Sequence, residues 1–526
     1  MLSHRRQTTI PCHLLLVLSL ASVLAANAWA AESASEIIPR LSLRGIYTDN
    51  IFLDDVNPTS EFVTEVTPGV QWKKKSRRVS ITADLALQIL NYAETENQEG
   101  DSTVLFPQFR LDTKTSLIPN YFFLDLGGQY NQSSAVLNDR LTFDNINLVG
   151  DRLDYTSYRV SPYIQHQTGS GFYYYLKAEQ SEINYDREDY SASETLSDTL
   201  NERYDLNVNN GQQNTRIHWS MSASSTTTER DTLLYHLSEY RSAQVNLDYR
   251  LSSKWSVVAK YGNSENFIDG IERGVNGEYV SGGFSWTPSN RFMLSATTGD
   301  QYQDANLRWT PSRRTDVELG YRNSEVGIIR GESYNAKVQW RARRVSSFLR
   351  YTESVTNEQL QTINGNTVIP VLDGQGNPQV DPLTGTPIVT FTPNYILVDD
   401  EFIQKRGEWS ISYTGRKFSN SVLFFTEDRD YLNETTQSGE SIGMNLNLEI
   451  PVGQGWRAII KGTYRDTDYR SDGATETIYY YRLGAEQRLG QHTRWGLYGQ
   501  RTEQDSERNL GNYEENRAVL EWIYRY

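Results

Sequence analysis

The chain has 526 residues and a net charge of −15, and only 37% of its residues are hydrophobic although 12% are aromatic. No stretch beyond residue 30 approaches the roughly 20 apolar residues of a transmembrane helix, which excludes a helical membrane protein. The acidic balance argues against a nucleic-acid partner, which leaves two classes, an exported β-rich soluble protein and an outer-membrane β-barrel, whose strands expose only every second residue to lipid.

The first thirty residues predict export. Arg5 and Arg6 precede an apolar core at residues 14–26 and a small-x-small cleavage site at residues 28–30. This is the pattern of a cleaved signal peptide, residues 1–30. The only cysteine, Cys12, lies within it, so we expect a mature chain of residues 31–526 that has no disulfide and forms a single domain.

Alternation with a period of two begins directly after this segment and predicts strands. Residues 40–48 place Leu41, Leu43 and Tyr47 on one face and charged Arg40 and Arg44 on the other. The same pattern returns at residues 79–89, 105–115, 217–223, 243–251, 334–340, 442–450, 481–485 and 515–526. The longer runs have about the length of a tilted membrane-spanning strand.

The connectors between these runs also alternate. One set is short and rich in Gly, Pro, Asn and Ser, whereas the other is longer and acidic. Short periplasmic turns and longer external loops are typical of outer-membrane barrels. Eleven short turns predict an all-β fold, a transmembrane, antiparallel, up-and-down β-barrel of about 24 strands of the outer-membrane type. A soluble sandwich, propeller or solenoid is the alternative, but the chain shows no fixed repeat.

A barrel of this size encloses a wide lumen that must be filled or must pass something. The first predicted strand starts shortly after the cleavage site, which argues against a receptor with a plug domain. The longest connector, residues 356–401, is either a constriction or lid, or a flexible surface loop.

The strand period also predicts which residues face the lumen. Mixed charges there would tune the selectivity of a pore, or would only pair across strands. Phe123, Tyr173 and Tyr175 have the same parity and could serve as aromatic platforms for a carbohydrate. The predicted pore-lining residues are Arg40, Arg44, Arg110, Asp112, Lys114, Lys177, Glu179, Arg482, Glu486, Arg488, Glu521 and Arg525.

The outward face predicts partners. The chain ends on an aromatic residue of its last strand, which resembles the signal read by the barrel-assembly machinery. Acidic loops would bind divalent cations shared with lipopolysaccharide, and a basic periplasmic rim would attract a polymer or an export component, although both could be merely solvated strand ends. The predicted aromatic girdle comprises Trp72, Trp219, Trp340, Trp522, Tyr524 and Tyr526.

The sequence offers little support for catalysis. The mature chain has four histidines, His166, His218, His236 and His492, and contains neither a GxSxG nor an HExxH motif. The acidic runs do not fit the spacing of a calcium-binding loop. We therefore predict that the protein is not an enzyme and that it holds no metal or cofactor.

The segment "YTDN" at Tyr47–Asn50, followed by "FVTEVTPG" at Phe62–Gly69, resembles the N-terminal signature of outer-membrane barrels associated with the PEP-CTERM/exosortase system. The family-motif residues are Tyr47, Thr48, Asp49, Asn50, Thr67, Pro68 and Gly69. The resemblance, shared in texture with β-barrel porins of exopolysaccharide gene clusters, implies a barrel that serves export.

Together these patterns predict a protein of the Gram-negative outer membrane. Our leading hypothesis is a passive conduit or scaffold for exopolysaccharide export, associated with a PEP-CTERM/exosortase system. Two alternatives remain open, a structural or adhesive surface barrel without transport and a general small-solute porin. By parity, Asp49 and Asn50 begin the first external loop, and a purely structural role would make them important for assembly.

Overall fold

The computed structural model describes most of the mature chain. The described residues are 34–96, 100–134, 144–149, 152–169, 171–186, 197–211, 216–231, 237–357, 369–370, 389–390, 401–415, 418–432, 438–508 and 511–526. The expected signal peptide, residues 1–30, and most of the connector at 356–401 lie outside them. Within the described ranges, no helix has the length and apolar character needed to cross a bilayer.

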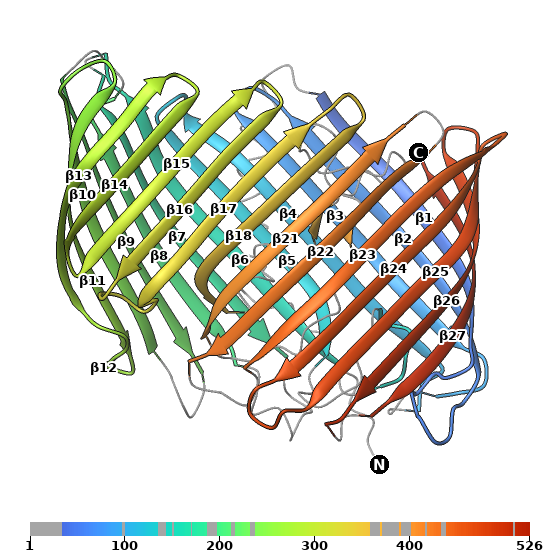
Figure 1. Cartoon of the computed structure of the whole chain (residues 1–526). Coiled ribbons are helices and arrows are strands. Elements are labelled where there is room, and N and C mark those ends of the chain that lie inside the picture. The colour runs from blue at the N-terminus through green and yellow to red at the C-terminus, as the bar shows by residue number, and fades with distance from the viewer. Residues whose placement is uncertain are drawn as a thin grey trace, which may run out of the picture.

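The described chain is all-β. A single sheet of 25 strands contains the two-residue β12 (Ile271–Glu272) and 24 long strands that form the wall (Figure 1). The long strands are β1 (Ala34–Thr48), β2 (Glu61–Lys75), β3 (Val79–Tyr92), β4 (Thr103–Ile118), β5 (Phe122–Ser134), β6 (Arg152–Gln167), β7 (Tyr173–Tyr185), β8 (Thr199–Asn209), β9 (Ile217–Arg230), β10 (Leu237–Arg250), β11 (Trp255–Ile268), β13 (Gly277–Ser289), β14 (Phe292–Asp300), β15 (Tyr302–Ser312), β16 (Thr315–Ser324), β17 (Gly331–Arg341), β18 (Val345–Asn357), β21 (Glu401–Thr414), β22 (Ser419–Tyr431), β23 (Gly439–Gly453), β24 (Trp456–Tyr469), β25 (Thr475–Leu489), β26 (Thr493–Ser506) and β27 (Tyr513–Arg525). A separate two-stranded pair joins β19 (Ile369–Pro370) to β20 (Val389–Thr390).

The sheet closes on itself. Each long strand pairs antiparallel with its neighbours in the chain, and β1 pairs with β27, Arg40 opposite Arg525 and Thr48 opposite Arg517. Closure gives the backbone groups at both ends of the sheet a partner, which a strand in lipid requires. The prediction of an antiparallel barrel of about 24 strands is confirmed.

The two faces of the wall have different chemistry. Residues such as Leu43, Leu497 and Leu520 point outward and keep 39%, 55% and 55% of their surface exposed. Arg44, which directly follows Leu43 in β1, points inward and pairs with Glu65. An apolar outer surface on a closed barrel has to face lipid, so this is a transmembrane barrel of the outer membrane.

The two ends of the barrel can be distinguished by their connections. The short turns lie at the end where β27 finishes and the C-terminus lies (Figure 1), as expected for the periplasmic end. The opposite end, which carries the longer connections, is called the external end below. The tightest external connection is the single residue Gln301 between β14 and β15, which adopts a φ of 61°.

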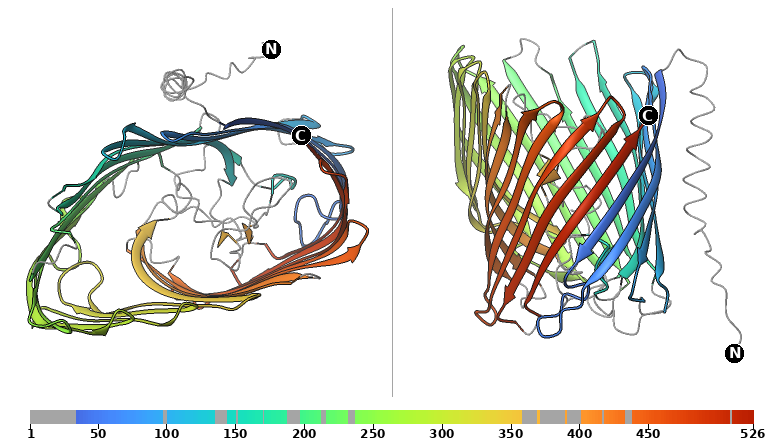
Figure 2. Two further views of the ribbon diagram at one scale, coloured as in Figure 1. Left: turned by 90° about the horizontal axis from the view of Figure 1, so that it is seen from above. Right: turned by 90° about the vertical axis from the view of Figure 1, so that its right-hand side faces the viewer.

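The wall departs from a simple cylinder beside β17. β16 pairs with β17 from Thr315 to Ser324, but β17 and β18 pair only over Ala336–Arg341 and Ser346–Tyr351. β18 continues to pair with β21 as far as its external end. Seen from above, the barrel is flattened, and the end of β18, drawn in gold, curls into the lumen (Figure 2).

Candidate functional site: the lumen wall

The strand register places all twelve predicted pore-lining residues on the lumen face. Arg44 lies opposite Glu65 on β2 and opposite Glu521 on β27, and every second residue follows the same face. The others on this face are Arg40, Arg110, Asp112, Lys114, Lys177, Glu179, Arg482, Glu486, Arg488 and Arg525. That they line a path for a solute remains a prediction.

The wall from β23 to β3 is dense in paired charges. Glu486 forms ion pairs with Arg457 at 2.9 Å and Arg494 at 3.5 Å, and accepts a hydrogen bond from the Tyr498 hydroxyl at 2.6 Å. Arg457 also reaches Glu449 at 2.6 Å. A charge that is buried in this way stays ionised only when such partners compensate its lost hydration. These charged side chains therefore stabilise one another in the wall.

A short segment between β5 and β6, residues 144–149, lies against this wall inside the barrel. Arg517 of β27 anchors it, with Nη1 2.7 Å from the Asp144 carboxylate and Nη2 donating to the Asn147 side chain. Asn147 also donates to Glu515 at 2.9 Å, and the Tyr92 hydroxyl donates to the Ile146 carbonyl at 2.9 Å. The segment narrows the lumen on this side.

The anchor also fixes the charge of Asp144. Burial by itself would raise the pKa of its carboxyl group. The positive charges of Arg517 and Arg44 and a hydrogen bond from the Ile146 amide outweigh burial, so the pKa of Asp144 lies below its ordinary value. The carboxylate is thus held in its ionised form at neutral pH.

The first external loop adds an apolar layer to the same region. Ile51 and Leu53 are almost completely buried, and the Leu148 amide donates to the Ile51 carbonyl at 3.0 Å. Ile51 and Ile146 share a buried cluster with lumen-facing Ile46 and Val519. Sequence reasoning placed Asp49 and Asn50 correctly after the strand end but did not find that the loop folds inward.

The "YTDN" residues tie the first strand to the last. The Thr48 hydroxyl donates to Glu515 at 2.6 Å, and Asp49 accepts bonds of 2.8 Å from the backbone and side-chain amides of Asn516. Buried Asn50 donates to the Glu514 carbonyl at 2.9 Å and bonds Asp54 twice at 2.8 Å. Tyr47 is exposed on the outer face. The motif therefore fastens the external end of the β1–β27 junction.

The other family-motif residues lie in the middle of β2. The Thr67 hydroxyl donates to Glu65 on the lumen face, and Pro68 lies on the outer face opposite Leu41. A Cβ at Gly69 would come within 2.8 Å of the Arg40 side chain and 2.9 Å of the Leu85 carbonyl. The glycine therefore leaves room for Arg40, which pairs with Asp84 at 2.5 Å.

The predicted girdle residues gather near the periplasmic end of the outer face. Trp72, Trp219, Trp340 and Trp522 all lie within a few residues of a short turn or the C-terminus. Trp522 stacks on Tyr524 with ring centroids 6.2 Å apart, and Tyr526 stacks on a histidine of the last short turn. This arrangement fits one aromatic belt at the periplasmic interface.

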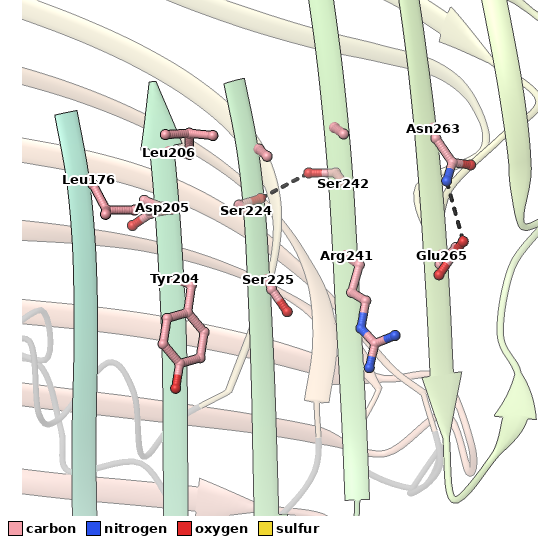
Figure 3. Close-up of a pocket in the computed structure, with 12 residues that line it drawn as sticks. Leu176, Tyr204, Asp205, Leu206, Ser224, Ser225, Arg241, Ser242, Asn263 and Glu265 are labelled. Carbon is pink, nitrogen blue, oxygen red and sulfur yellow. Dashed lines mark hydrogen bonds between the residues drawn. The ribbon is translucent and has the colours of Figure 1, made fainter. Parts of the chain in front are cut away.

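The wall formed by β9 and β10 has a different character. Between Ser220 and Thr228 on β9, and between Ser238 and Asn246 on β10, every lumen-facing residue is uncharged. These residues are Ser220, Ser222, Ser224, Thr226, Thr228, Ser238, Tyr240, Ser242, Gln244 and Asn246. The Ser224 and Ser242 hydroxyls bond across the two strands at 2.8 Å (Figure 3).

An ion pair crosses the lumen at the external end. Arg230 at the end of β9 lies 2.9 Å from Glu401 at the start of β21, and the Tyr240 hydroxyl of β10 donates to the same carboxylate. β21 is not a neighbour of β9 or β10 in the sheet. Both charged side chains are about 96% buried. The bridge holds the inward-bent end of β21 against the opposite wall.

The described histidines make structural contacts. His166 lies on the outer face beside two tyrosines, a ring nitrogen of His218 is 3.1 Å from Arg250, and His492 bonds the Arg525 carbonyl at 2.8 Å. His236 lies outside the described residues. Among the residues that the structure describes, no three His, Cys, Asp or Glu side chains are grouped so that they could hold a metal ion.

Comparisons with known proteins give only distant structural similarities. No family model and no curated protein matches the sequence. The FrpB iron transporter from Neisseria meningitidis is 9% identical with a TM-score of 0.49, covering 93% of this chain and 82% of that chain. The siderophore receptor PirA from Pseudomonas aeruginosa is 8% identical with a TM-score of 0.42, covering 94% and 80%. These similarities say nothing about what this chain binds.

Proposed function

We propose that this protein is a passive conduit for an exopolysaccharide across the outer membrane, associated with a PEP-CTERM/exosortase system. The observation that carries the proposal is the uncharged wall of β9 and β10, where hydroxyl and amide side chains face the lumen without interruption. The resemblance of Tyr47–Asn50 and Phe62–Gly69 to the signature of that barrel family supports the link to export.

The chemistry of this wall suits a sugar polymer. Sugar hydroxyls both donate and accept hydrogen bonds, and so do serine, threonine, asparagine and glutamine side chains. A polymer can therefore exchange water for wall contacts of similar strength at each step. Conduction requires many such weak sites rather than one tight one, because a tightly bound segment would not leave.

The opposite wall would complete a narrowed path. Its charges are engaged with one another, as in the Glu486 cluster, so they would not grip a passing neutral polymer. Residues 144–149 and the Arg230–Glu401 bridge reduce the open cross-section near the external end. Passage of the polymer would need no energy input, because the constriction is part of the wall.

The periplasmic rim would receive the polymer or its delivering partner. Exposed basic residues occupy several short turns, including Arg77 and Arg78 between β2 and β3, Arg313 and Arg314 between β15 and β16, and Arg343 and Arg344 between β17 and β18. A ring of positive charge would attract the acidic surface of a periplasmic export component. Lipopolysaccharide would surround the outer face.

Export in cells tests the proposal. Deleting the gene should lower surface polysaccharide and leave polymer in the periplasm, and the wild-type barrel should restore export. Ser222→Arg with Ser224→Arg places charge on the uncharged wall and should restore it poorly. Ser225→Arg is the matched control, because Ser225 follows Ser224 but lies on the outer face beside Arg241 (Figure 3). Normal surface polysaccharide in the deletion strain would refute a conduit.

That refuting result would favour a second function, a structural surface barrel without transport. The specific observation behind it is that the lumen is crossed by the Arg230–Glu401 bridge and lined by residues 144–149, both of which brace the wall. In that case, the deletion should weaken the outer membrane, measured as increased sensitivity to detergent. Surface polysaccharide should then be unchanged.

A further inference from the structure

A strip of aromatic rings lies on the lumen face near the periplasmic end of β5, β6 and β7. Phe123 and Tyr163 face each other across β5 and β6, with ring centroids 4.8 Å apart and planes 10° apart. Tyr175 of β7 continues the strip, 5.9 Å from Tyr163. Tyr173, the next lumen position on β7, extends it towards the turn. Sequence parity identified Phe123, Tyr173 and Tyr175 but missed Tyr163, the ring that joins them.

These rings are not part of a packed core. All are only half-buried, in a wall whose buried apolar cluster lies elsewhere, around Ile46 and Ile146. Large rings that stay partly exposed in an aqueous lumen are costly unless something apolar covers them at times. The ring faces of a carbohydrate, which carry C–H groups, are a surface of that kind.

The polar groups beside the strip can bind hydroxyls. Gln165 and Asn207 lie on the two strands directly opposite Tyr175. Asp125, the next lumen residue after Phe123, has a buried Oδ1 that accepts no hydrogen bond from any residue within the described ranges. A buried carboxylate oxygen without a donor is unfavourable. A ligand hydroxyl can supply the missing donor.

The charged groups around the strip are of both signs. Lys177 is paired with Glu179 at 2.7 Å, and Glu179 also accepts a bond from Ser161 at 2.6 Å. Asp125, whose Oδ1 accepts no hydrogen bond within the described ranges, is itself an anion, and Lys114, directly opposite on β4, and Arg159 act on its charge. A negatively charged ligand would meet it unfavourably, whereas an uncharged hydroxyl-bearing ring would not.

We propose that Phe123, Tyr163 and Tyr175, with Asp125, form a binding site for uncharged hexopyranose rings at the periplasmic mouth of the lumen. This inference rests on the proposed conduit function and specifies its entry step. The rings stack on the sugar faces, and Asp125, Gln165 and Asn207 bond the hydroxyls. Polar groups that fix orientation beside apolar platforms are typical of small-molecule sites.

Binding to the purified, folded, mature barrel in detergent tests the site. The probes are cellohexaose and maltohexaose, two linear uncharged hexasaccharides of different linkage, titrated by calorimetry. At least one should bind saturably. Tyr163→Leu should weaken binding about tenfold, since it removes a stacking face, and Tyr163→Phe should bind as the wild type does. Asp125→Ala should also weaken binding severalfold. Heat-modifiable migration on gels verifies folding, and Tyr175→Leu replaces Tyr163→Leu if that variant does not fold.

The matched control is Tyr174→Leu, because Tyr174 neighbours Tyr175 but lies on the outer face against Tyr121. It should leave binding unchanged. The proposal is overturned if neither hexasaccharide binds the wild type, if Tyr163→Leu binds as tightly as the wild type, or if Tyr174→Leu weakens binding equally. Because binding is measured without cells, its failure is distinct from a failure of export, which the gene deletion measures.

Discussion

Replacing Arg517 by methionine should release residues 144–149 from the lumen wall. Methionine roughly keeps the volume of the side chain but removes the cation shared by Asp144 and Glu515, which lie 2.7 Å from its guanidinium atoms. The Arg517 and Glu515 side chains are only 4% and 3% exposed. Breaking such a buried pair costs about 3–5 kcal/mol.

Other contacts of the segment remain, and each is weaker than the lost pair. The Tyr92–Ile146 and Leu148–Ile51 hydrogen bonds contribute about 1 kcal/mol each. Burial of the Ile146 side chain contributes about 1.5–3 kcal/mol. Their sum is about the size of the loss, so the ratio of docked to undocked segment should fall by a factor of about one hundred or more, at 1.4 kcal/mol per tenfold change.

A single cysteine makes this release measurable. The mature chain is expected to lack cysteine, so Ile146→Cys gives a unique thiol at a position that is 1% exposed. Its reaction with a maleimide in the folded barrel should be slow with Arg517 present and much faster with Arg517→Met. Arg501→Met is the control, because Arg501 is 41% exposed and pairs on the outer face with Glu514. Equal labelling rates with and without Arg517, or equal acceleration by the control, would refute the reasoning.

Three other contacts of the barrel give testable outcomes. The pKa of Asp144 is lowered, so the stabilisation that its negative charge gives is complete above about pH 3.9. This stabilisation is lost as the pH falls through the pKa of Asp144 in the folded protein. Hydrogen exchange of residues 144–149, corrected for intrinsic rates, should rise in that pH range, and in Asp144→Asn it should be fast at all pH values. Glu401→Gln removes the carboxylate charge that pairs with Arg230 and should raise single-channel conductance, whereas Glu239→Gln, in an exposed outer-face pair, should not. Asn50→Ala should cost about 1–3 kcal/mol and lower the yield of heat-modifiable barrel, with export per folded molecule unchanged; a full yield would contradict the fastening role of the motif.

The wall could be predicted from the sequence because its chemistry is local. Leu43 and Arg44 are neighbours with opposite environments, and this contrast is visible in any run of about ten residues. Register irregularities on the barrel strands lie beside short turns, as between Ser116 and Ile118 or Pro451 and Gly453. Parity is therefore uninterrupted across the membrane, and one alternating run fixes the orientation of a whole strand.

The interior of the lumen could not be predicted in the same way. Ile146 sits in a connector between polar residues, and nothing near it in the chain indicates burial. Its anchor, Arg517, is separated from Asp144 by 373 positions and reads locally as one more lumen-facing base. The partner of Arg230 is also remote in the sequence, 171 positions away, and Glu401 reaches it only because β21 bends across the barrel. Such contacts depend on closure of the sheet. No local sequence pattern indicates which distant residues closure brings together.

The difference between the two walls explains how a barrel full of charges could still favour an uncharged polymer. On the β23–β3 side, separating one charged side chain from the Glu486 cluster would leave another buried charge without its partner. This costs about 3–5 kcal/mol. One sugar carboxylate or amine in a hydrated lumen offers much less than that in return, as exposed ion pairs show. The paired wall would therefore act as an inert boundary.

The polymer would instead contact the hydroxyl and amide side chains of β9 and β10 and the rings around Tyr163. Selectivity would then arise because the charges already satisfy one another, and a variant that frees one of them, such as Arg457→Gln, should make the lumen retain charged oligosaccharides that the wild type does not hold.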